Sequence, residues 1–202
     1  MDLTKQAKVN LTKGATLNLV KEDGNALTKT RLALGWDAVK KKGLFGSRSK
    51  DIDLDASIIA LNDTKDLAYT VFYGSLNSWD HAVLHSGDNL TGAGEGDDEV
   101  ISVDLSRVDP RVKYLACVIT SYSGQTFEEV ENVFCRLDDM SASRPDPVAA
   151  YNLKDSANAR GMVMAVISRV GNGWSIEAKG IPVANARTPR DLEVVRAVQA
   201  SI

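Results

Sequence analysis

An acidic, glycine-rich stretch from His85 to Glu99 limits the folds open to this chain. It holds five carboxylates and four glycines, and it contains no Lys or Arg. Two carboxylates about 4 Å apart repel each other by roughly 1 kcal/mol in water, and by more where solvent is partly excluded. The glycines let the backbone fold back on itself. A compact fold of this stretch therefore favours a bound cation. The carboxylates are Asp88, Glu95, Asp97, Asp98 and Glu99.

The ligand types available in this stretch are hard oxygens. Calcium takes about 6–8 carboxylate, carbonyl and water oxygens in a loose geometry, whereas magnesium demands a tighter octahedron. The stretch therefore predicts a calcium site. The alternative interpretation is a solvated turn between strands, because loops usually lie at the surface.

A second acidic cluster precedes the first in the chain. Asp51, Asp53 and Asp55 alternate with apolar residues, which predicts a strand with the aspartates together on one face. The spacing imitates the start of an EF-hand loop, but Ala56 stands where that loop needs Gly and Asn62 where it needs a bidentate Glu. An EF-hand is therefore rejected. The residues expected to face inward are Ile52, Leu54, Ala56 and Ile58.

Short apolar runs separated by turn signals predict successive strands along most of the chain. The run from Leu67 to Tyr73 is nearly continuous and suits a central strand buried on both faces. The segment Gly171-Asn172-Gly173 predicts a tight hairpin. About ten short strands imply an all-β fold, an antiparallel β-sandwich.

One or two short peripheral helices complete this prediction. Thr126 and Glu129 fit a capping box, and Phe127, Val130 and Phe134 fall on one helical face after it. A second helix start follows Thr188, with Pro at the first position. We expect a single domain over residues 1–202, of which about 186–202 form a helical tail.

Composition and charge exclude several classes of function. The 202 residues are 44% hydrophobic and 25% charged, which is ordinary for a globular domain. The formal charge of −3 argues against a nucleic-acid partner, since phosphate binding needs a basic face. The N-terminus lacks the apolar core of a signal peptide, and no apolar run is long enough to span a membrane, so we expect a cytoplasmic protein.

Two smaller features have ordinary interpretations. The basic run from Lys40 to Lys42, with Arg48 and Lys50, is expected to be a solvated loop. Cys117 and Cys135 each lie in an apolar run, which predicts two buried free thiols in a reducing compartment.

The sequence also contains residues suited to two chemistries other than calcium binding. His81 and His85 have the i, i+4 spacing of a zinc site, but they bracket a strand end and no thiolate lies near them in sequence. Paired carboxylates such as Asp97 and Asp98 could serve an enzyme that acts on a sugar or an oxyanion, although the stretch offers no aromatic residues to line a sugar cleft. The enzyme is the alternative to a binding module.

Four segments of the chain carry a family resemblance: Leu34 to Asp37, Asp53 to Ser57, His85 to Gly92 and Gly94 to Glu99. The chain resembles the TerD family of tellurium-resistance and general stress proteins over most of its length, up to Trp174. The resemblance implies a bacterial, calcium-binding β-sandwich, linked to tellurite, phage and chemical-damage resistance, with no established catalytic activity.

The resemblance implies a set of metal ligands and a role. More than one calcium ion is expected, while Asp98 is expected to face solvent. The implied role is a non-enzymatic stress-response module that presents a calcium-ordered surface to other proteins of a stress-response complex, with membrane association through a partner and no nucleic acid. The implied ligands are Asp37, Asp53, Asp55, Asp88, Asn89, Glu95, Asp97 and Glu99.

Overall fold

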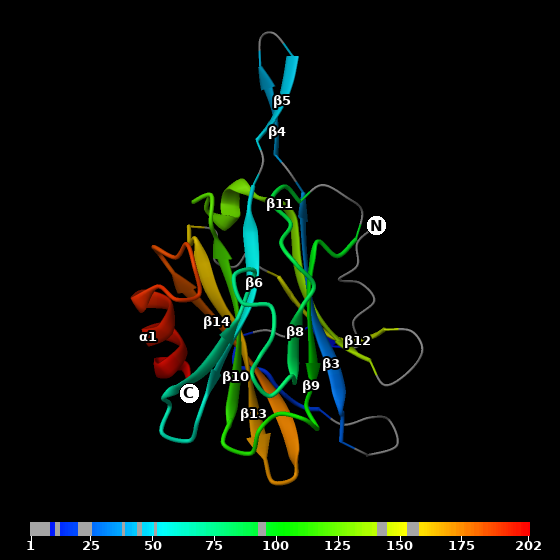
Figure 1. Ribbon diagram of the computed structural model, residues 1–202. Coiled ribbons are helices and arrows are strands. Elements are labelled where there is room, and N and C mark those ends of the chain that lie inside the picture. The colour runs from blue at the N-terminus through cyan, green and yellow to red at the C-terminus, as the bar shows by residue number, and fades with distance from the viewer. Residues whose placement is uncertain are drawn as a thin grey trace.

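The computed structural model describes residues 9–10, 13–19, 26–37, 39–43, 46–50, 52–92, 96–140, 145–152 and 158–202. These residues form two six-stranded sheets that pack face to face, with a separate two-stranded hairpin (Figure 1). Neighbouring strands are antiparallel except β1 and β12, which are parallel. The predicted all-β sandwich is confirmed.

The first sheet places the strand that ends at Asp37 beside the two strands that hold the ends of the acidic stretch. Its order is β1 (Val9–Asn10), β12 (Asp146–Asn152), β11 (Glu131–Asp139), β3 (Lys29–Asp37), β9 (Glu99–Asp104) and β8 (Val83–His85). The acidic stretch leaves β8 and returns as β9, so its two ends are held by neighbouring strands, as predicted.

The second sheet carries the other acidic cluster at the start of β6. Its order is β2 (Thr16–Asn18), β14 (Gly173–Val183), β13 (Gly161–Val170), β10 (Tyr114–Ser121), β6 (Leu54–Leu61) and β7 (Leu67–Val71). The predicted hairpin joins β13 to β14, where Val170 pairs with Gly173 and Gly171 has φ +56°.

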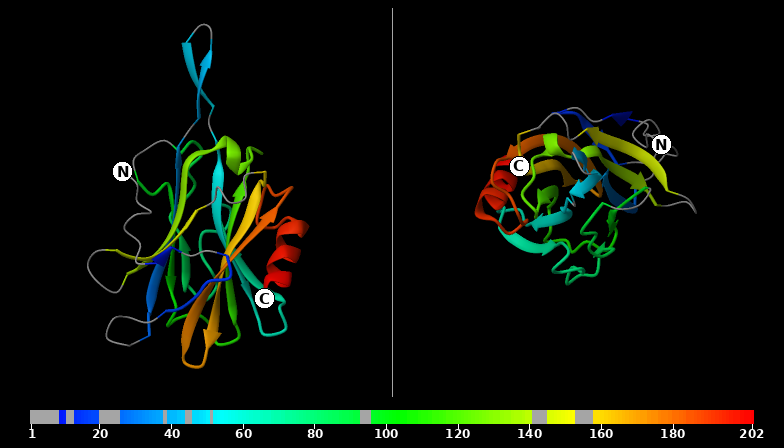
Figure 2. Two further views of the ribbon diagram at one scale, coloured as in Figure 1. Left: turned by 180° about the vertical axis from the view of Figure 1, so that it is seen from behind. Right: turned by 90° about the horizontal axis from the view of Figure 1, so that it is seen from above.

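The main core lies between the sheets and follows the alternation in the sequence. Ile52, Leu54, Ala56 and Ile58 are fully buried and belong to it, as expected. The opposite face of the second sheet forms a smaller core with the helix α1 (Leu192–Ser201), whose Val194 and Val198 are buried. Figure 2 shows this helix lying against β13 and β14. β6 is therefore buried along its whole length.

Two predicted elements differ from the structure. Among the described strands, the one that begins at Leu67 pairs with β6 alone and is an edge strand, and Leu67 is exposed, so the prediction of a central strand was wrong. The capping box at Thr126 and Glu129 is present, but it starts only a short 3-10 helix, η2 (Phe127–Glu129). Beyond it, β11 replaces the predicted helix, because Val133, Cys135 and Leu137 alternate toward the core with a period of two.

The basic run is not a loop. Its backbone forms the antiparallel hairpin of β4 (Val39–Gly43) and β5 (Gly46–Lys50), which projects from one end of the sandwich (Figure 1). The tail helix exists but starts after Asp191, later than predicted. Cys117 and Cys135 are buried free thiols, as expected. In the described part of the chain, no helix is both long and apolar enough to cross a bilayer.

Candidate metal centre

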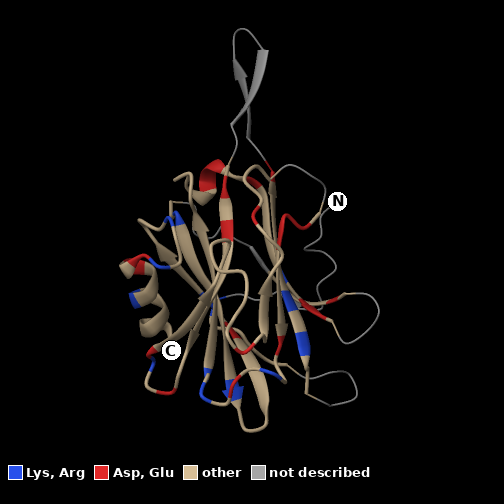
Figure 3. Cartoon of the chain, viewed as in Figure 1, with Lys and Arg blue, Asp and Glu red and all other residues tan. Residues whose placement is uncertain are grey.

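Three carboxylates converge where the start of β6 meets the acidic stretch. Asp53 directly precedes β6, Asp55 lies on it, and Asp88 follows β8. One carboxylate oxygen from each residue lies within 4.8 Å of the others. The structure therefore brings residues of both predicted acidic clusters into one group. Figure 3 shows Asp and Glu on β6 and the adjacent loops, at the end of the sandwich from which the hairpin projects.

Two of these carboxylates are short of hydrogen-bond donors. Asp55 is 1% exposed, and its Oδ2 is buried without a hydrogen-bond partner among the described residues. The same holds for Oδ1 of Asp53. A buried carboxylate oxygen without a donor is costly unless a cation compensates it. The group therefore has the character of a cation site.

The proton affinities of the group follow from burial and crowding. Burial, then the charge of Glu99, raises the pKa of Asp55 to about 8. Burial, then the charges of Asp88 and Glu99, raises the pKa of Asp53 to about 6. A divalent cation acts in the opposite direction, because it favours the ionised carboxylate. Cation binding is therefore expected to release protons near neutral pH.

Glu99, at the start of β9, connects the segments that surround the three carboxylates. It is fully buried, and its Oε2 accepts a hydrogen bond from the backbone N–H of Ala56 at 2.7 Å. Its Oε1 accepts one from the backbone N–H of Asn89 at 3.3 Å. The buried His85 lies with Nε2 3.5 Å from Oε2. The carboxylate of Glu99 therefore accepts hydrogen bonds from β6 and from the acidic stretch, and it lies beside His85 at the end of β8.

Asn89 and Asp98 shape the acidic stretch itself. The side-chain oxygen of Asn89 accepts hydrogen bonds from the backbone N–H groups of Thr91 and Gly92. Its side-chain nitrogen donates to Asp98 at 2.8 Å, and Asp98 also accepts from the backbone N–H of Trp36 at 2.9 Å. Asp98 is half-buried, so its expected exposure to solvent is only partial. These two donors fix its side chain against β3.

Asp97 points to a different set of partners. Its carboxylate pairs with Arg31 at 2.8 Å and with Arg136 at 3.0 Å. Both arginines also pair with the fully buried Asp138, at 2.7 and 2.6 Å. This four-residue network joins the acidic stretch to β3 and β11. Asp97 is therefore held by arginines, outside the group of Asp53, Asp55 and Asp88.

The remaining predicted ligands occupy other positions. Asp37 ends β3, and its carboxylate accepts a hydrogen bond from the side chain of Asn132 at 2.6 Å. The charge of Asp37 is one of the causes that raise the pKa of Asp98, after burial, so these two carboxylates are neighbours. Glu95 and Asp51 lie outside the described residues.

A close backbone approach brings the acidic stretch onto β3. Gly92 has φ +59°, and a Cβ built there would lie 2.3 Å from Nε1 of Trp36. The same indole nitrogen donates to the backbone oxygen of Ile52 at 2.8 Å, directly before Asp53. Only glycine permits both this backbone conformation and this contact. Trp36 thus lies between the acidic stretch and the segment that leads into β6.

Sequence reasoning missed an aromatic pair beside the group. Burial, followed by the charge of Asp55, raises the pKa of Tyr73, and Asp88 and Asp53 contribute. The ring of Tyr122 lies edge-on to that of Tyr73, with centroids 5.9 Å apart. Tyr73 lies two residues after β7 and Tyr122 directly follows β10, so the pairing of these two strands with β6 brings both residues near Asp55. Local sequence contains no signal for this proximity.

Comparisons with known proteins agree with this architecture. The sequence profile of the TerD domain family matches residues 7–186. The chain is 41% identical to tellurium resistance protein TerZ of Serratia marcescens over 195 residues, covering 94% of this chain and 98% of that protein. It is 35% identical to stress response protein SCP2 of Bacillus subtilis (strain 168), covering 85% of this chain and 91% of the relative.

A solved structure has the same fold. It is described as a homologue of telluride resistance protein (TerD) from Streptomyces coelicolor A3(2), and it superposes with a TM-score of 0.68 at 17% identity. The match covers 79% of this chain and 92% of that one.

Proposed function

This chain belongs to the TerD domain family, and we propose that it is a calcium-binding, non-enzymatic module of a stress response that includes tellurium resistance. The observation that carries the proposal is the group of Asp53, Asp55 and Asp88, with oxygens within 4.8 Å of one another. Two of these side chains have buried oxygens without donors among the described residues.

The chemistry of this group suits calcium better than other common metals. It offers carboxylate oxygens, which are hard ligands, whereas closed zinc sites take histidine nitrogen and cysteine sulfur. Calcium needs about 6–8 oxygen ligands. The three carboxylates would supply some of them, and water or backbone carbonyls would supply the others. Asp53, Asp55 and Asp88 would hold the ion, and Glu99 would keep their surroundings in place.

The role proposed for the ion is to order a binding surface. Without a cation, the raised pKa values of Asp53 and Asp55 reflect repulsion and burial that oppose a compact acidic stretch. A bound ion would remove that repulsion and fix the stretch against the start of β6. The ordered surface would then bind another protein of a stress-response complex.

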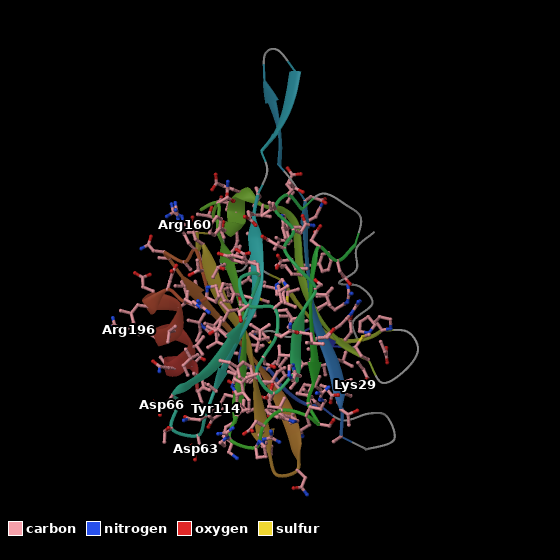
Figure 4. The ribbon with its side chains drawn as sticks, viewed as in Figure 1. Lys29, Asp63, Asp66, Tyr114, Arg160 and Arg196 are labelled. Carbon is pink, nitrogen blue, oxygen red and sulfur yellow. The ribbon has the colours of Figure 1, made fainter. Side chains whose placement is uncertain are left out.

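Thermal unfolding with and without calcium tests the proposal. Calcium at about 1,000 times its dissociation constant is expected to add roughly 4 kcal/mol of stability if it binds only the folded protein. Asp55→Asn should abolish most of this gain. The matched control is Asp63→Asn in the β6–β7 turn, an exposed residue at the other end of β6 (Figure 4), which should keep it. A melting curve that calcium leaves unchanged contradicts the proposal.

A further inference from the structure

A small cavity lies in the main core between the two sheets, and none of its described lining residues is a carboxylate of the candidate metal centre. Its volume is about 20 Å³, and roughly 10–15 Å³ is enough to hold one water molecule. Cys117 on β10, Cys135 on β11 and Met164 on β13 all line it. The cavity therefore has room for one atom or small ion, with three sulfur-bearing side chains around it.

The fold brings these three side chains together from separate parts of the chain. Cys135 lies on the first sheet, whereas Cys117 and Met164 lie on neighbouring strands of the second. Met164 has no pairing partner on either neighbouring strand, so it is the extra residue of a β-bulge. Met164 and Ala165 consequently both belong to the main core, although successive residues of a regular strand face opposite sides. The bulge therefore turns the side chain of Met164 into the core beside Cys117.

Both thiols are buried and protonated at neutral pH. Burial raises the pKa of Cys117 to about 12. Burial, then the charge of Cys117, raises the pKa of Cys135, so the two thiols are close enough to affect each other's ionisation. A metal ion that binds a thiol displaces its proton, because the ion stabilises the thiolate directly. The thiols are therefore unreactive as free groups, yet they can serve as metal ligands.

We propose that Cys117, Cys135 and Met164 bind one soft monovalent metal ion of the copper(I) class. Thiolate and thioether sulfurs are soft ligands, which select copper(I) over hard cations such as calcium. A cavity with room for one atom admits a single ion and not a metal cluster. Zinc is less suited, because closed zinc sites take four nitrogen or sulfur ligands, and no histidine is among the described residues that line the cavity.

The balance of charge favours a monovalent ion over a divalent one. A net charge in an apolar core is costly unless it is compensated. One thiol releases its proton to water and its thiolate bonds to the monovalent ion, so the two charges cancel and no electron is transferred. The other thiol and the thioether of Met164 donate electron pairs as neutral ligands. A second thiolate would lack a counter-charge, because Arg136, which also lines the cavity, already pairs with Asp97 and Asp138.

A competition titration tests the site. The full chain is kept reduced and free of oxygen, in EGTA so that calcium plays no part, and is titrated with copper(I) held by the coloured chelator bathocuproine disulfonate. Because both thiols are buried, the ion must enter during local opening of the sandwich, so the samples are equilibrated before measurement. The variants are C117S/C135S and M164L. The matched control is M162L, at a buried methionine of the same strand and core that does not line the cavity.

The wild type and the M162L control are expected to take one equivalent of copper(I) with the same affinity. C117S/C135S should take none. M164L should bind at least about tenfold more weakly, the smallest loss that is usual even for residues that only support a metal site. Copper(I) binding that survives in C117S/C135S would overturn the proposal, as would equal affinities of M164L and M162L or a stoichiometry well above one.

Melting curves separate a site in the folded protein from thiols that react only in the unfolded chain. A ligand of the folded state stabilises it, whereas a ligand of the unfolded state destabilises the fold. Copper(I) is therefore expected to raise the melting temperature of the wild type, and a lowered melting temperature would overturn the proposal. If the serine variant does not fold, because it buries two new hydroxyl groups, C117A/C135A takes its place in both measurements and should melt at the same temperature with and without copper(I).

Discussion

Glu99 on β9 accepts a hydrogen bond at 2.7 Å from the backbone N–H of Ala56 on β6, so one side chain joins the two sheets of the sandwich. The contact is fully buried and lies one residue after Asp55. This hydrogen bond fixes the position along β6 at which the strand meets the acidic stretch. The carboxylates of the candidate metal centre are therefore positioned from the core outward.

Glu99→Gln is expected to destabilise the protein in chelator by roughly 1–3 kcal/mol, since an amide has only one oxygen to accept from Ala56 and Asn89. Urea unfolding measures the change. Glu128→Gln, at an exposed glutamate on η2, is the control and should be neutral. Equal stability of both variants would show that the two hydrogen bonds contribute nothing.

Asp97→Asn is expected to act on folding and not on calcium coordination. The substitution weakens the pairing with Arg31 and Arg136, and at such a partly buried site the loss is roughly 1–3 kcal/mol, in chelator and in calcium alike. Asp88→Asn should behave in the opposite way and reduce only the gain from calcium. If Asp97→Asn removes the calcium gain and leaves the stability in chelator intact, Asp97 is a ligand, as the family resemblance implies.

The strands were predictable because the alternation of buried and exposed residues is a local feature of the sequence. On β3, Leu32, Leu34 and Trp36 alternate in the sequence and are buried in the structure. Periodicity does not encode the order of strands in a sheet. For that reason the apolar run from Leu67 predicts a central strand, although among the described strands it pairs with β6 alone.

The sequence predicts which residue types form the candidate site, but it does not predict which groups each acidic residue contacts. Asp88 and Asp97 are equivalent in the sequence, since both are aspartates next to glycine in one acidic stretch. They separate in the structure because Arg31 and Arg136, on two different strands, lie beside Asp97. Asp98 shows the same limit, because its donor from Trp36 is a backbone group that no side-chain pattern reveals.

Purified protein is expected not to reduce tellurite catalytically. Burial raises the pKa of Cys117 to about 12, and it raises the pKa of Cys135 as well, so neither thiol supplies a thiolate near neutral pH. Tellurite loss measured over time should equal that of a protein-free control. Sustained turnover that Cys117→Ser abolishes would contradict this expectation and support the enzyme alternative.

The stability of the metal-free protein is expected to fall with rising pH. The pKa values of Asp53 and Asp55 are raised from 3.8 to about 6 and about 8, so the folded state holds protons that the unfolded state has released. Their contribution is complete below about pH 4 and is lost as pH rises to about 8. Calcium must displace these protons, so its affinity should rise over the same range. Melting in chelator and calcium titrations between these limits measure both trends.

The last prediction is that Asp55 and Asp88 hold the same ion. Asp55 lies on β6 of the second sheet and Asp88 lies in the loop between β8 and β9 of the first, yet one carboxylate oxygen of each lies within 4.8 Å of the other. If they share a calcium ion, Asp55→Asn and Asp88→Asn should be non-additive, with a coupling of about 0.5–3 kcal/mol in calcium affinity. Calorimetry on the two single variants and the double variant measures this coupling. Asp55→Asn paired with Asp97→Asn gives the comparison, because Asp97 is held by Arg31 and Arg136, and that pair should be additive. Additive effects for Asp55 and Asp88 would mean that the two carboxylates act on calcium independently, which would exclude a shared ion.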